Sequence, residues 1–254
     1  MSNNLMGIYT IWLRDLRRFR RDKSRIIGAI VQPALFLIFL GTGLSKGLTI
    51  TFQSGNHPGY LIFIYPGIIG MTLLFTSVFS ALSIVWDREV GFLKEVMVAP
   101  ISRWAVAIGK ALGGATVATI QGILMLIFAP IIGVKLGLGI IVTIIPIMLF
   151  IAISLTSMGI VAAAYMNSMQ GFTIVMNFIM LPMFFLSGAM FPISKLPLWM
   201  AILVRINPLT YGVDLLRMAT MAQAHFSLIT NLSVTGAFGL IMTAFAVVLF
   251  SRQE

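Results

Sequence analysis

Long apolar runs separated by short polar stretches dominate the chain and predict membrane-spanning helices. A helix needs about 20 mostly apolar residues to cross about 30 Å of hydrocarbon. Six runs are long enough, at roughly residues 26–45, 60–86, 104–134, 140–164, 171–190 and 228–250. The second and third exceed the required length, so we expect them to tilt or to extend past the headgroups. Prolines inside the runs each free a carbonyl that neighbouring helices must satisfy, among them Pro33, Pro66, Pro146 and Pro182.

The polar stretches between the runs predict three further elements. The segment before the first run carries Leu13, Leu16 and Phe19 at a helical spacing of i, i+3, i+6. Five arginines share this segment and would anchor an amphipathic helix, about residues 5–25, along the inner membrane surface: Arg14, Arg17, Arg18, Arg20 and Arg21. The regular apolar spacing favours this helix over a disordered basic tail.

The stretch DREVGFLKEVMVAP, residues 87–100, is unusually charged for this chain. Asp87 can cap the start of a short helix over about residues 87–99, and Pro100 can end it. Apolar side chains would face the spans and charged ones the cytosol. Two interpretations remain: an interfacial hairpin that only anchors two spans, or a docking surface for a cytoplasmic partner, which we favour.

The stretch from residue 186 to residue 217 contains Pro192, Pro197 and Pro208, which divide it into short pieces. Residues 198–206 form a helix too short to span, and residues 209–223 form a second helix in which Asp214 and Arg217 can pair. We expect an external helical hairpin over about residues 191–225 that closes the outer end of a pathway. The predicted fold is therefore an all-α membrane protein with six spans in one domain, residues 1–254.

Composition agrees with this fold, since 59% of the 254 residues are hydrophobic and 9% are charged, against about 25% charged in a typical soluble domain. The net charge of +10 reflects basic residues beside spans rather than nucleic-acid binding. With both termini inside, the N-terminal segment, residues 87–110 and the C-terminal tail hold seven, four and one basic residues, and the outer loops hold five. The positive-inside rule therefore places both termini in the cytoplasm. The first apolar run is too long for a cleaved signal peptide.

Candidate chemistry inside the spans is sparse. The six runs contain no acidic residue, which argues against an ion-coupled transporter. Lys110 lies about two turns into the third run, where it could snorkel to the inner interface. Gly109 and Gly113 form a small-xxx-small pair that allows close helix contact. A candidate substrate path comprises polar and flexible side chains, for which interhelical hydrogen bonding or plain packing is the alternative explanation: Gln121, Met176, Asn177, Met180 and Met183.

The sequence excludes several kinds of site. The chain has no cysteine, and its two histidines lie apart from acidic residues in sequence, so we expect no metal site and no catalytic residue. A GxxxxGK phosphate loop followed by Ser or Thr is also missing, so the chain would not hydrolyse ATP through that motif.

Two motifs resemble the permease subunits of type-2 ATP-binding-cassette exporters. The first is DREVGFLKEVMVAPISR before a long span, and the second is LSGAMFPISKLP with NPLTYGVDLLR before the last span. The resemblance covers essentially the whole chain and is strongest to the drug-resistance branch, the daunorubicin-exporter-like membrane subunits. It implies a permease dimer, with two copies of a separate cytoplasmic ATPase that binds ATP and Mg. The helix between the second and third spans would be the coupling helix, seated in a groove of that ATPase.

The resemblance also assigns residues. The coupling stretch comprises Asp87, Arg88, Glu89, Gly91, Phe92, Lys94, Glu95, Pro100 and Arg103. The external gate comprises Gly188, Pro192, Asn207, Pro208, Tyr211, Asp214 and Arg217. Relatives often carry more polar residues beside Gly91 than Val90 and Phe92.

The function we expect is export of a hydrophobic or amphipathic substrate, such as a drug, lipid or glycolipid, across a prokaryotic plasma membrane. Polysaccharide or lipo-oligosaccharide export is the alternative within the class. A secondary transporter or a membrane anchor subunit is the alternative outside it.

Overall fold

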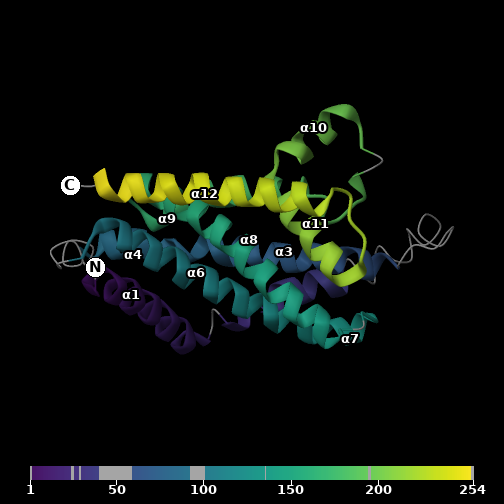
Figure 1. Ribbon diagram of the computed structural model, residues 1–254, viewed down its shortest axis with the longest axis horizontal. Coiled ribbons are helices and arrows are strands. Elements are labelled where there is room, and N and C mark those ends of the chain that lie inside the picture. The colour runs from purple at the N-terminus through teal and green to yellow at the C-terminus, as the bar shows by residue number, and fades with distance from the viewer. Residues whose placement is uncertain are drawn as a thin grey trace.

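The computed structural model describes residues 2–23, 26–28, 30–39, 59–91, 101–134, 136–193 and 196–252. This part of the chain forms helices and contains no strand (Figure 1). Residues 26–28 and 30–39 are helical. The other elements, in chain order, are α1 (Ser2–Arg21), α3 (Tyr60–Ser80), α4 (Leu82–Glu89), α6 (Arg103–Met125), a 3₁₀ turn (Leu126–Phe128), α7 (Ala129–Ile132), α8 (Leu138–Tyr165), α9 (Met169–Phe185), α10 (Leu198–Ile206), α11 (Pro208–Met221) and α12 (Leu228–Arg252).

Four of the six predicted spans correspond to helices that are long and apolar enough to cross a membrane: Tyr60–Glu89, Arg103–Ile132, Leu138–Tyr165 and Leu228–Ser251. The helix at the predicted fifth span, α9, has 17 residues, or about 25 Å. In the first predicted span residues 26–28 and 30–39 are helical, and its other residues lie outside the described part. Six spans therefore remain a prediction.

The long helices run side by side along one axis of the molecule (Figure 1). One end, which we call the α4 end, holds the start of α1, the end of α4 and the end of α12. The opposite end, the α10 end, holds α7, α10 and α11. This arrangement agrees with the alternation of inner and outer loops that the sequence predicts.

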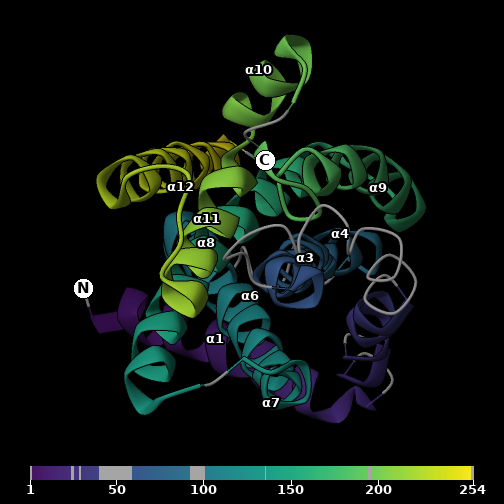
Figure 2. The ribbon, with the colours of Figure 1, turned by 90° about the vertical axis from the view of Figure 1, so that its right-hand side faces the viewer.

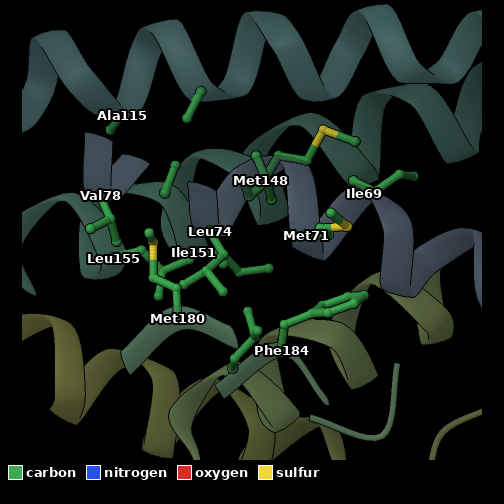
Figure 3. Close-up of a cluster of buried hydrophobic side chains, with 14 of the residues drawn as sticks. Ile69, Met71, Leu74, Val78, Ala115, Met148, Ile151, Leu155, Met180 and Phe184 are labelled. Atoms are coloured by element: carbon green, nitrogen blue, oxygen red, sulfur yellow. The ribbon is translucent and has the colours of Figure 1, made fainter. Parts of the chain in front are cut away.

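Helix α3 lies at the centre of the bundle, and most of its residues are buried. Its side chains are apolar on every face, which fits a helix packed inside a bundle. Figure 2 shows α6, α8 and α9 around it. In the most apolar stretch of Tyr60–Glu89 72% of the residues are buried, against 17% in that of α12, which leaves α12 free for lipid or another chain. Figure 3 shows the centre of this core, formed by side chains of α3, α6, α8 and α9: Ile69, Met71, Leu74, Val78, Ala115, Met148, Ile151, Leu155, Met180 and Phe184.

Helix α1 packs along α6 through small residues. A Cβ added at Gly109 would lie 3.0 Å from Cβ of Ile11, and one at Gly113 would lie 3.1 Å from Cβ of Asp15. Trp12 Nε1 donates a hydrogen bond to Thr116 Oγ1 at 3.0 Å. The small-xxx-small pair therefore makes a close helix contact, as its spacing predicted, and the partner is α1, which the spacing did not identify.

Replacing Gly113 with valine is expected to push α1 off α6. The new side chain meets the carboxylate and Cβ of Asp15, and such overpacking costs about 1–3 kcal/mol. Thermal unfolding of the detergent-solubilised chain measures the loss. Gly139→Val is the matched control, since an added Cβ there meets nothing within 4 Å. Equal destabilisation by both changes would contradict the close contact between α1 and α6.

Candidate functional site

The three residues that end α4 contact four other helices at the α4 end. The prediction that Asp87 caps a new helix is wrong, because Asp87 lies inside α4, which ends at Glu89. Asp87 is 6% exposed. Its Oδ2 accepts from Arg14 Nη2 at 2.9 Å and from Lys110 Nζ at 3.1 Å. The carboxylate is therefore committed to α1 and α6, which explains why it cannot serve as a cap.

Lys110 does not snorkel to the interface as predicted, because it is paired inside the protein and is 5% exposed. Besides Asp87, its ammonium donates to Ser83 Oγ at 2.9 Å and lies 3.5 Å from Asp15 Oδ1. Arg14 Nε lies 3.8 Å from the same Asp15 oxygen. Two cations and two carboxylates thus form a balanced cluster that joins α1, α4 and α6. A buried ion cluster needs such mutual compensation, because each charge alone is costly to desolvate.

Arg88 caps the end of α8. Its Nη1 donates to the carbonyls of Ala163, Ala164 and Met166 at 3.2, 3.4 and 2.7 Å. The last carbonyls of a helix have no partner within the helix, and a cation there also interacts favourably with the helix dipole. The guanidinium therefore binds α4 to the C-terminus of α8.

Glu89 holds the start of the next helix. Its Oε1 accepts a hydrogen bond from the Met169 amide at 2.9 Å, at the first residue of α9. Ser168 caps the same helix end by accepting from the Gly171 amide at 3.1 Å. We call Asp87, Arg88 and Glu89 the α4 triplet. Asp87 reaches α1 and α6, Arg88 reaches α8, and Glu89 reaches α9.

The α4 triplet stands next to the rest of the predicted coupling stretch. Gly91 has a left-handed backbone (φ +80°), which glycine adopts without strain. Four predicted coupling residues lie outside the described part of the chain: Phe92, Lys94, Glu95 and Pro100. Beyond them, Arg103 donates to the Ser251 carbonyl at 3.0 Å, which ties the start of α6 to the end of α12.

The predicted external gate residues gather at the α10 end, around the start of α11. Asn207 caps α11 by accepting from the Leu209 amide at 3.0 Å, and its Nδ2 donates to the Met183 carbonyl of α9 at 2.6 Å. Pro208 occupies the first turn of α11, and Tyr211 donates to the Arg205 carbonyl at 2.7 Å. Pro192 is half-buried between α9 and α10.

Asp214 and Arg217 form the predicted pair, with Nη1 and Oδ1 3.6 Å apart. Arg217 also donates to the Gly188 carbonyl at 2.9 Å and lies 4.6 Å from the ring centre of Phe63. Burial lowers the pKa of Arg217 and the Asp214 charge raises it. The guanidinium stays protonated at neutral pH, as arginine does in proteins.

The five candidate path residues come from α6 and α9 and pack against neighbours in this conformation. Gln121 is buried on α6 and accepts a hydrogen bond from Thr76 of α3. Met176 and Met180 are buried on the face of α9 that meets the core (Figure 3 shows Met180). Asn177 and Met183 are half-buried. Their role in a substrate path stays a prediction.

The geometry defines a polytopic helical membrane protein whose α4 end concentrates charges on one short stretch. Residues 6–221 match the model of the ABC-2 type transporter family. The chain belongs to this family.

Three relatives illustrate the breadth of the match. The ycf38 protein of Cyanophora paradoxa, named as a transport permease, is 31% identical over 84% of this chain and 73% of its own length. Nodulation protein J of Rhizobium leguminosarum bv. viciae is 24% identical over 84% of this chain and 82% of its own. YbhR of Escherichia coli K12, named as a multidrug ABC transporter permease, is 27% identical over 68% of this chain and 47% of its own.

Proposed function

We propose that the chain is the transmembrane permease subunit of an ATP-driven exporter. Two copies pair in a prokaryotic plasma membrane, with both termini in the cytoplasm. Each copy binds one cytoplasmic ATPase subunit, which holds ATP and Mg. The substrate is a hydrophobic or amphipathic molecule, a drug, lipid or glycolipid; the relative named for multidrug transport supports the first of these.

The observation that carries this proposal is the α4 triplet. A partner that moves residues 92–100 would act directly on the helix end from which Asp87, Arg88 and Glu89 extend. Their contacts distribute that force to α1 and α6 through the ion cluster, to α8 through three carbonyls and to α9 through one amide. The triplet is therefore suited to transmit motion between a soluble subunit and the bundle.

Helix α9 carries the motion onward to the α10 end. Its first amide is held by Glu89, and the Met183 carbonyl near its other end is held by Asn207 of α11. Because α9 is held at both ends, displacement at the α4 end would shift the predicted external gate. ATP binding drives transport if the ATPase prefers one of two such permease states over the other.

Reconstitution with the partner ATPase tests this function. We expect substrate efflux that requires ATP, and Glu89→Ala should reduce substrate-stimulated ATP hydrolysis by at least about fivefold, a typical coupling energy. Glu254→Ala removes one acidic group elsewhere in the chain and should have no effect. Transport by the permease alone under an ion gradient would indicate a secondary transporter. Unchanged stimulation and unchanged assembly in Glu89→Ala would overturn the coupling role of the triplet.

A further inference from the structure

A groove runs between the second half of α1, the start of the first apolar run and α6. Its volume is about 610 Å³, within the range of small-molecule sites in proteins. Apolar side chains and arginines line it: Leu13, Leu16, Arg17, Phe19, Arg20, Arg21, Ile26 and Ile120. We call it the α1 groove.

The arginines of the α1 groove are available to a ligand. Arg17, Arg20 and Arg21 are exposed. No carboxylate of the described residues lies within ion-pair distance of any of the three, whereas Arg14 on the same helix is paired with Asp87. Three positive charges on one and a half helical turns, unneutralised by the protein, attract an anion.

The position of the groove matches the level of the inner headgroups. The chain enters its first apolar run at Ile26, directly after the arginines. The helical stretch Arg103–Ile132 has 30 residues, or about 45 Å, which exceeds the hydrocarbon thickness by about 15 Å. The excess lets α6 reach past the hydrocarbon at the α4 end, where α1 packs beside it. The contact of Asp15 with Gly113 places Arg17, Arg20 and Ile120 near one level of α6, so the long arginine side chains can reach headgroups while their stems and Ile120 lie against acyl chains.

We propose that the α1 groove binds one anionic phospholipid of the inner leaflet. The phosphate group is held by Arg17, Arg20 and Arg21, and the first acyl carbons lie on Leu16, Phe19 and Ile120. The apolar floor favours a lipid over an acidic protein surface, which would leave those side chains uncovered. This site goes beyond the proposed function, because the permease forms it without an ATPase.

Native mass spectrometry of the full chain in detergent tests the site, with phosphatidylglycerol and phosphatidylcholine as probes. We expect one phosphatidylglycerol per chain, bound in preference to phosphatidylcholine. In the variant R17Q/R20Q its binding should weaken by about 30-fold, as two surface charges predict. R18Q/R205Q is the matched control, since it removes two exposed arginines that do not line the groove, and it should bind like the unmodified chain.

Two further arms separate the groove from bulk charge attraction. Ile120→Trp fills the apolar floor without changing charge and should also weaken phosphatidylglycerol binding. Glycerol phosphate, which presents the headgroup chemistry alone, should not compete. The proposal is overturned by equal binding of the two lipids, by an equal loss in the control variant or by effective competition from glycerol phosphate. It is also overturned if R17Q/R20Q loses the ATPase subunit while phosphatidylglycerol binding is unchanged, since the arginines would then serve the protein partner.

Discussion

Replacement of Lys110 with methionine is expected to destabilise the protein by about 3–5 kcal/mol, the usual cost of removing one partner from a buried ion pair. Methionine fills a similar volume, so the loss reflects charge rather than a cavity. Asp87, with a side chain only 8% exposed, would keep Arg14 as its one cation, and Ser83 would lose its ammonium donor. Thermal unfolding of the solubilised full chain measures the effect. Arg205→Met, which removes an exposed cation on α10, should change stability by less than about 1 kcal/mol.

The double variant Lys110→Met/Asp87→Asn separates charge imbalance from packing. It restores the balance between Arg14 and Asp15, so it should recover much of the stability that Lys110→Met loses. Coupling should remain impaired in the stable double variant, because the charged link from α4 to α6 is gone. If the double variant were as unstable as the sum of the two single changes, the cluster would not act as one electrostatic unit.

The sequence predicts features that depend on local pattern. The apolar runs locate the long helices, and prolines place the short ones: Pro197 precedes α10 and Pro208 begins α11. The pair of Asp214 and Arg217 follows from their spacing on one helix turn. The Gly109 and Gly113 pair likewise marks a helix contact, although the sequence does not say that α1 is the partner.

The α4 triplet could not be read from local pattern, because each of its contacts joins residues far apart in the chain. Arg88 and its carbonyl partner Met166 are 78 positions apart. One signal was available for the ion cluster. Lys110 and Asp87 stand near the inner ends of their predicted elements, Asp15 lies on the helix predicted along the inner surface, and an unpaired lysine inside a span is costly. The prediction that the charged side chains of residues 87–99 face the cytosol missed that Asp87, Arg88 and Glu89 contact the bundle.

The second large effect is expected for Asp214→Ala, which should lower the free energy of unfolding by at least about 4 kcal/mol. Its carboxylate is fully buried and accepts from the His225 and Phe226 amides at 3.0 and 2.9 Å and from Asn231 Nδ2 at 2.9 Å. Alanine would leave these donors and the Arg217 charge without their acceptor, and each stranded donor costs about 1–3 kcal/mol. Because the donors precede or begin α12, the change should release α11 from α12.

A single introduced cysteine reports that release, since the chain has no cysteine of its own. Val213 is fully buried against Gly70 of α3. A thiol in Val213→Cys should therefore react slowly with a membrane-impermeant maleimide. Labelling should accelerate when Asp214→Ala is added and change less with Asp214→Asn, which keeps one acceptor oxygen and the side-chain shape. Faster labelling from outside intact cells would also place the α10 end on the outer face. Slow labelling in Asp214→Ala, with unfolding temperature unchanged, would mean that the carboxylate does not hold α11 to α12.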